Sequence, residues 1–222
     1  MKHYLILSIL FVFSLTSSSC GADSYLFEED PKENVSPNET NPTVLNFLGD
    51  SIIDYWIDVD DAFPDYLCYN YGWTAKGIDS FLGRIDVSIL CDTECVIEIG
   101  TNDMRKVINA KNIDNYIEHY IDVLTSLNAK CIYLLSLLPR NRAKDGGFDF
   151  NSYYPEINKR IQERVADRMD NVVYIPLYDI FLKDGQINWD YTYDGLHPNA
   201  KGYDVMASEI KSFLKKEEKY NQ

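Results

Sequence analysis

The sequence predicts an α/β fold, a three-layer α/β/α sandwich built on one parallel sheet of about five strands. From Val44 onward, short apolar runs alternate with segments whose apolar residues recur at helical spacing. That order is typical of a parallel sheet with helices on both faces. The chain has 222 residues and a 45% apolar composition. A chain of this length can form one sizeable hydrophobic core but is short for two such cores. We therefore expect one folded domain.

The strand candidates are five short apolar runs, several of them rich in β-branched and aromatic residues. They span residues 44–48, 66–69, 96–99, 131–138 and 172–175. Each run is followed by polar or glycine-containing residues that end it, so the runs are separate strands rather than one long apolar segment.

Three segments carry an apolar stripe at steps of three and four residues, which predicts helices. The first stripe runs from Ile113 to Leu124, and the second contains Ile157, Ile161 and Val165 in a segment opened by Pro155. A proline in the first helical turn is favourable, because its missing N–H has no partner there. The third helix is expected to begin after Pro198 and to include the following apolar residues: Tyr203, Met206, Ile210, Phe213 and Leu214.

The N-terminus has the pattern of an export signal. Lys2 precedes an apolar run over residues 4–13 that is too short to span a bilayer, and small residues follow as far as Ser19. We expect a signal peptide over residues 1–19. Cys20 directly after three serines resembles the lipobox of bacterial lipoproteins, in which a diacylated cysteine becomes the new N-terminus. Secretion without lipidation is the alternative, because Ser17 stands where the lipobox usually has Leu.

Residues 20–42 are polar and acidic, so they are expected to form a flexible tether between Cys20 and the folded domain. The domain itself is expected over residues 43–217, with a short tail at 218–222. Together these features predict an exported, cell-envelope lipoprotein at the outer membrane or cell surface, or a periplasmic or secreted protein if Cys20 is not lipidated.

The net charge of −14 at pH 7 limits the possible partners. Nucleic acids and anionic lipid surfaces are bound through clusters of Lys and Arg. We therefore expect no nucleic-acid partner, and membrane contact only through an N-terminal lipid anchor. The sequence leaves the oligomeric state open.

Four cysteines follow Cys20, at positions 68, 91, 95 and 131. In an exported protein an even number permits disulfides, but buried thiols are equally compatible, and no pairing is favoured. The cysteines lack the paired spacing of a zinc site, and we expect no metal and no organic cofactor.

Polar residues follow four of the predicted strands. They are Gly49-Asp50-Ser51, Gly72-Trp73-Thr74, Gly100-Thr101-Asn102-Asp103 and Pro139-Arg140-Asn141. Because parallel strands end at the same edge of a sheet, these residues should share one rim, where α/β enzymes place their sites.

Ser51 lies where a strand meets a probable helix start, which makes it a candidate nucleophile; an ordinary turn and helix cap is the alternative. Such a serine needs a histidine base. His3 is removed with the signal, and His119 falls on the expected solvent side of its helix, which leaves His197. Asp194, three residues earlier, is close enough to orient the imidazole.

Three sequence blocks, in this order along the chain, resemble those of the SGNH hydrolases (GDSL-type esterases and lipases). They are Gly49-Asp50-Ser51, Gly100-Thr101-Asn102-Asp103 and Asp194-Gly195-Leu196-His197-Pro198. The resemblance implies a flavodoxin-like sheet. It also implies roles: Ser51 as nucleophile and backbone oxyanion donor, Asn102 as side-chain oxyanion donor, His197 as base, and Asp194 as its partner.

A second backbone donor is expected from the residues after the second strand. Gly72 is favoured, since Gly72-Trp73-Thr74 resembles the Gly-x-Thr of the family, whereas ungapped spacing from Asn70 would place Ala75 there. Alanine can supply the same N–H if its backbone avoids positive φ.

The resemblance implies a serine esterase that hydrolyses small acyl esters through an acyl-serine intermediate. The expected surface display favours acetyl esters of carbohydrates as substrates. A short-chain lipid or aryl esterase and a lysophospholipase are alternatives within the family. A glycan-binding lipoprotein without turnover is an alternative of another class. Trp56, Trp73 and Trp189 could stack on sugar rings, or pack in the core.

Overall fold

The sheet has five parallel strands in the order β2-β1-β3-β4-β5. The strands are β1 (Thr43–Gly49), β2 (Tyr66–Asn70), β3 (Glu94–Glu98), β4 (Cys131–Leu135) and β5 (Val172–Ile175). The structure is a computed structural model that describes residues 42–220, with side-chain surroundings as far as Leu214. All five predicted strands are confirmed, with ends that differ from the prediction by three residues at most, and the order is that of a flavodoxin-like sheet.

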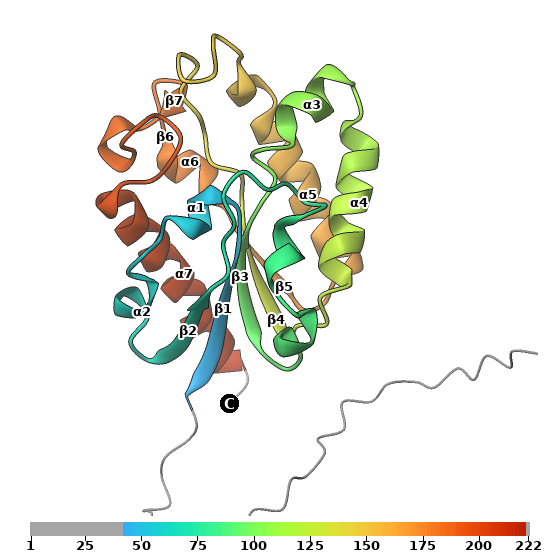
Figure 1. The fold of residues 1–222 in the computed structure, drawn as a ribbon, viewed down its shortest axis with the longest axis vertical. Coiled ribbons are helices and arrows are strands. Elements are labelled where there is room, and N and C mark those ends of the chain that lie inside the picture. Colours follow the sequence, from blue (N-terminus) through green and yellow to red (C-terminus); the bar gives the residue numbers. More distant parts are fainter. Residues whose placement is uncertain (1–41, 221–222) are drawn as a thin grey trace, which may run out of the picture. The chain divides into compact units, whose positions relative to one another are not determined.

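Helices cover both faces of the sheet, as predicted (Figure 1). One face carries α3 (Met104–Asn109), α4 (Ile113–Thr125) and α5 (Tyr154–Arg168), and the other carries α1 (Ser51–Asp54), α2 (Val59–Ala62), α6 (Tyr178–Phe181) and α7 (Ala200–Tyr220). The three helices predicted from apolar stripes are confirmed as α4, α5 and α7. The last helix runs to Tyr220, so residues 218–220 extend it instead of beginning a tail.

Alternate residues of the central strands point into the two halves of the core, which is why the strands read as continuous apolar runs. In β1, Leu45 and Phe47 pack under α2 and α7, while Leu48 packs under α4; all three are fully buried. The sheet is therefore buried on both faces, and only its edges and rims reach solvent.

Short elements fill the connections. Four 3-10 turns lie at residues Phe81–Arg84, Val87–Leu90, Phe150–Ser152 and Trp189–Tyr191. A small hairpin joins β6 (Leu182–Lys183) to β7 (Gln186–Ile187). Its turn residues Asp184 and Gly185 both have positive φ, at 52° and 75°. An Asp-Gly pair is the usual sequence signal for such a turn. The sequence therefore contains the signal for this hairpin, although the hairpin was not among the predicted elements.

Several predictions concern residues 1–41, which lie outside the described residues. They are the signal peptide at 1–19, the lipidation of Cys20 and all but the last residue of the tether at 20–42. Within residues 42–220, no helix is both long enough and apolar enough to cross a bilayer.

Candidate active site

Ser51 is the first residue of α1, directly beyond the end of β1. Asp50 caps the helix: its Oδ1 accepts a hydrogen bond from the N–H of Ile52 at 3.0 Å. The first N–H groups of a helix have no partner within it and carry the positive end of the dipole. The strand-to-helix turn therefore places the Ser51 hydroxyl beside unpaired donors.

The structure brings His197 and Asp194 to Ser51. Ser51 Oγ lies 2.9 Å from His197 Nε2, and His197 Nδ1 lies 3.0 Å from Asp194 Oδ2. These two contacts form a hydrogen-bonded chain from hydroxyl to imidazole to carboxylate, although the serine and the histidine are 146 residues apart. Such a chain is the arrangement in which an imidazole can take a proton from serine while a carboxylate fixes its tautomer.

The loop that carries Asp194 and His197 is held by its own hydrogen bonds. Asp194 Oδ1 accepts from the N–H groups of Leu196 at 3.0 Å and His197 at 2.9 Å. The Thr192 hydroxyl donates to the His197 carbonyl at 2.7 Å. A neighbouring loop also braces it, because Asn141 N–H donates to the Gly195 carbonyl at 2.8 Å. The imidazole is thus fixed from both sides of its loop.

Lys144 is a second partner of Asp194 that the sequence analysis missed. Its Nζ lies 2.6 Å from Asp194 Oδ2, the oxygen that also faces the imidazole. Burial by itself raises the pKa of Asp194, but hydrogen bonds from Lys144 and from the backbone and ring of His197 outweigh it and hold the pKa well below its usual range. Asp194 is therefore ionised throughout the neutral range, as an orienting carboxylate must be.

Asn102 lies in the turn after β3, one residue before Asp103. Its side-chain amide donates to Asp50 Oδ2 at 3.2 Å and to the Lys76 carbonyl at 2.9 Å. The amide is therefore tied to the residue that precedes Ser51. Donation to an oxyanion requires at least one of these hydrogen bonds to yield.

The N–H of Gly72, the residue favoured over Ala75 by the sequence, already has an acceptor in this structure. It donates to the side-chain Oδ1 of Asn70 at 2.9 Å. Gly72 also packs directly on α1, where an added Cβ would lie 2.2 Å from the Asp54 nitrogen. Its lack of a side chain is thus required for close packing.

Ala75 has the conformation that normally belongs to glycine. Its φ is +61°, which costs an L-residue about 1 kcal/mol or more. Its N–H makes no hydrogen bond to another residue within the described range. The expected condition that Ala75 avoids positive φ is therefore not met. Its unused N–H and its spacing from Asn70 nevertheless make Ala75 a candidate for the second backbone donor.

Two buried carboxyl groups lie beneath the serine. Asp50 and Glu98 are both fully buried, and neither oxygen of Glu98 has a hydrogen-bond partner among the described residues. Burial, and then the charge of Asp50, raise the pKa of Glu98 well above its usual range, while nearby Arg140 opposes this. Burial likewise raises the pKa of Asp50, although its hydrogen bond from Ile52 acts in the other direction. The pair therefore favours a protonated Glu98.

Arg140, which follows β4, is bonded to Asp145 and not to Ser51 or His197. It also donates to the Thr101 carbonyl at 3.3 Å. These contacts fix residues 140–145, the loop that presents Lys144 to Asp194.

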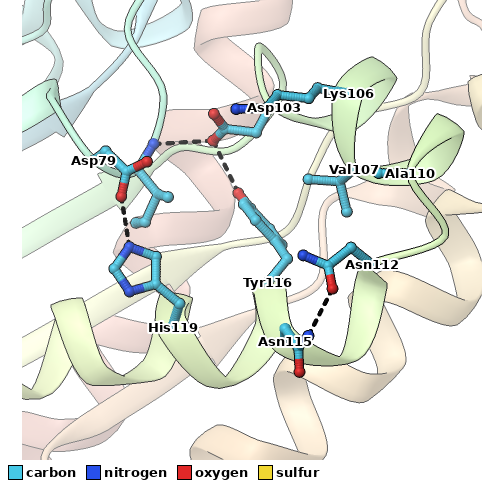
Figure 2. Close-up of a pocket in the computed structure, with 10 residues that line it drawn as sticks. Asp79, Asp103, Lys106, Val107, Ala110, Asn112, Asn115, Tyr116 and His119 are labelled. Atoms are coloured by element: carbon cyan, nitrogen blue, oxygen red, sulfur yellow. Dashed lines mark hydrogen bonds and ion pairs between the residues drawn. The ribbon is translucent and has the colours of Figure 1, made fainter.

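A hollow of about 300 Å³ lies beyond Asn102, between the loop after β2 and helices α3 and α4 (Figure 2). Asp103 lies in its wall, where Oδ2 accepts from the Tyr116 hydroxyl at 3.0 Å and from the Ile78 N–H at 2.9 Å. His119 lies at the exposed side of α4, with Nε2 2.6 Å from Asp79 Oδ1. His119 therefore forms a separate pair, as expected for a residue on the solvent side of its helix.

The three tryptophans differ in their access to a ligand. Trp56 is 4% exposed and its ring stacks on Tyr203 at 5.0 Å, so it belongs to the core. Trp73 is covered by Lys76 and Arg84, whose cationic groups lie 4.0 and 4.6 Å from the ring. Trp189 is 58% exposed and lies beside the His197 loop, 3.3 Å from where a Cβ of Gly195 would be. Of the three predicted stacking residues, Trp189 alone is well exposed.

Cys68 and Cys95 are thiols, and burial raises the pKa of Cys95 to about 12. Such a thiol packs as a small apolar group. Within residues 42–220, no cluster of three or more His, Cys, Asp or Glu side chains is placed to hold a metal ion.

Comparison with solved structures shows the same fold. A GDSL-like lipase from Bacteroides thetaiotaomicron is 23% identical, with a TM-score of 0.62 over 82% of this chain and 92% of that chain. The acetyl xylan esterase AlAXEase is 18% identical, with a TM-score of 0.61 over 77% and 98%. A lipase/acylhydrolase from Enterococcus faecalis is 16% identical, with a TM-score of 0.59 over 79% and 96%.

A curated relative, the N-acylneuraminate cytidylyltransferase of Escherichia coli, is 32% identical over 181 residues. The match covers 77% of this chain but only 40% of the length of that relative.

The model of the GDSL-like Lipase/Acylhydrolase family matches residues 47–205, a range that begins just before Ser51 and ends after His197. The matched range includes all three motif blocks and all five strands but the first residues of β1. The chain therefore belongs to the GDSL-like lipase/acylhydrolase family of the SGNH superfamily.

Proposed function

We propose that the protein is a serine esterase that removes small acyl groups, chiefly acetyl, from carbohydrate hydroxyls. The observation that carries the mechanism is the chain from Ser51 Oγ through His197 to Asp194, with contacts of 2.9 and 3.0 Å. A serine in such a chain is activated by its histidine base.

In the proposed mechanism, His197 Nε2 accepts the proton of Ser51 as Oγ attacks the ester carbonyl. The oxyanion that forms is held by the N–H groups of Ser51 and Ala75 and by the amide of Asn102. The C–O bond to the alcohol then breaks, and His197 returns the proton to the departing oxygen. Water, activated by the same imidazole, releases the acyl group from Ser51.

The preference for a small acyl group is supported by the loops around the serine. One long connection at this rim, between β4 and α5, is pinned by the hydrogen bond from Arg140 to Asp145, which is 8% exposed. A lid over a long acyl chain needs a segment that is free to move. The family's acetyl xylan esterase supports acetyl as the acyl group.

A structural neighbour supports a carbohydrate alcohol, because it is named for acetyl xylan. Neither the cytidylyltransferase activity nor the anionic sugar for which the curated relative is named is proposed for this chain, since the match covers 40% of that protein.

The test is release of acetate from a panel of acetylated xylose, glucose and N-acylneuraminate, beside p-nitrophenyl esters of increasing chain length. We expect acetyl esters to be hydrolysed fastest, and Ser51→Ala to lose at least a thousandfold in kcat. A preference for long-chain esters or lysophospholipids would favour the lipid esterase. Binding of glycans without acetate release would favour the binding protein.

We also propose export and lipidation at Cys20, which rest on the sequence of residues 1–20. Metabolic labelling with a radioactive fatty acid, with Cys20→Ala as the unlabelled control, tests this. Equal labelling of both chains contradicts it.

A further inference from the structure

A groove of about 640 Å³ lies between the α1–α2 segment and the loop that carries His197. This volume is in the range of small-molecule sites. Its walls include Tyr55, Ile57 and Asp58 on one side and Tyr193 on the other. Nothing in the proposed mechanism uses these side chains.

Two of the lining residues, Tyr55 and Tyr193, connect the groove to the reacting residues. Tyr55 follows Ser51 by one helical turn, and its N–H donates to the Ser51 carbonyl at 3.1 Å. The Tyr55 ring lies 4.9 Å from the His197 ring, and the Tyr193 ring stacks on the same imidazole at 5.7 Å. Two exposed tyrosines thus flank the base.

The chemistry of the leaving group determines which half of the ester lies here. The imidazole returns its proton to the departing oxygen, so the alcohol must leave along His197. In the proposed mechanism the oxyanion is held by Asn102, which is not among the residues that line the groove. The groove beside Tyr55 and Tyr193 is therefore on the alcohol side.

The groove is acidic. Asp58, Asp61 and Asp204 line it, and no Lys or Arg is among its described lining residues. None of the three carboxylates forms an ion pair with another residue of the described range. With a chain charge of −14, these groups repel an anionic alcohol.

The same surface suits a neutral polyol. Tyr55 and Tyr193 are 39% and 58% exposed, so each offers a ring face for the apolar face of a sugar. Ionised carboxylates only accept hydrogen bonds, and sugar hydroxyls can donate them. Ile57, at 84% exposure, adds an apolar contact.

We propose that this groove binds the alcohol half of the ester and selects neutral, hydroxyl-rich alcohols over anionic ones. The inference rests on the proposed esterase function and adds the charge and class of the alcohol.

The test compares two substrates that differ by one carboxylate, methyl O-acetylglucoside and methyl O-acetylglucuronoside. We expect kcat/KM to favour the neutral glucoside about tenfold at low salt, with a smaller ratio at high salt. In the triple variant Asp58→Asn, Asp61→Asn and Asp204→Asn, the ratio should approach one. Tyr193→Leu should raise KM for the glucoside, and Tyr193→Phe should not.

The matched control removes the same charge elsewhere, through Glu163→Gln, Asp167→Asn and Asp170→Asn on or just after α5, which covers the other face of the sheet. It should keep the wild-type ratio. Equal rates on both sugars in the wild type, or a ratio changed equally by both triple variants, would overturn the inference. So would a tenfold preference for acetylcholine over the glucoside, which would indicate a site for cations. If the esterase proposal itself is wrong, the result is different: no substrate, p-nitrophenyl acetate included, would release acetate.

Discussion

Lys144 and His197 share one oxygen of Asp194. The Nζ of Lys144 is 2.6 Å from Oδ2, and the imidazole Nδ1 is 3.0 Å from the same atom. The hydrogen bond from Lys144 helps to hold the pKa of Asp194 below its usual range, which keeps the carboxylate ionised beside the imidazole.

Replacing Lys144 with Met removes one of the hydrogen bonds that lower the pKa of Asp194, so that pKa should rise. We expect the acid limb of the kcat/KM profile to move to higher pH, because Asp194 must be ionised to orient the imidazole. Lys144→Arg keeps the charge and should retain the wild-type profile. A profile that falls in height without moving along the pH axis would mean that Lys144 acts only by holding its loop in place.

Asn102→Ala should lower kcat/KM about a hundredfold or more, because one oxyanion donor is removed. The amide also bonds Asp50 and the Lys76 carbonyl, so a loss of stability could produce the same result. Urea unfolding separates the two explanations. We expect a change in the free energy of unfolding of about 1 kcal/mol, and undiminished ester cleavage by Asn102→Ala would remove this residue from the site.

Gly72 and Ala75 should respond in opposite ways to exchange between glycine and alanine. Gly72→Ala places a Cβ 2.2 Å from the Asp54 backbone and should cost about 3 kcal/mol or more. Ala75→Gly relieves a residue at φ +61° and should keep stability within about 1 kcal/mol and activity near the wild type. Ala75→Val should lower kcat, because a β-branched residue resists this backbone. A well-folded, fully active Gly72→Ala enzyme would contradict the packing described above.

Glu98→Gln should flatten the dependence of stability on pH. A carboxyl group whose pKa is raised by folding binds its proton more tightly in the folded state. Its contribution to stability is therefore complete below the usual titration range of Glu, and is lost as the pH rises through the raised value. Relative to Glu98→Gln, the wild type should lose stability as the pH rises above the usual titration range of Glu, by up to about 1.4 kcal/mol per pH unit. Parallel curves of unfolding free energy would indicate that Glu98 is ionised at its usual pH.

The fold was largely predictable, because strands buried on both faces leave a direct trace in the sequence. Runs such as residues 44–48 and 172–175 have no polar side to obscure them, and the apolar stripe of residues 113–124 identifies α4 by its spacing. The hairpin at Asp184-Gly185 was missed because its strands have two residues each, too few to form a pattern.

The parts of the candidate site that could be predicted are those whose residues lie within a few positions of one another in the sequence and so form a motif. Asp194 and His197 are three positions apart, and Asp50 directly precedes Ser51. Lys144 lies 50 residues from Asp194, so no local pattern could connect them. Gly72 was preferred over Ala75 from residue type, whereas the backbone angle and the partner of the Gly72 N–H are properties of the folded chain.

The distance along the chain between Ser51 and His197 has a consequence for biosynthesis. The hydroxyl belongs to the first strand-helix junction and the imidazole precedes the last helix, with 146 positions between them. A nascent chain released from the ribosome before residue 197 lacks its base however well its first half folds. Ester cleavage by this protein should therefore report completion of the whole domain, and truncated translation products should be inert toward the cell's own esters.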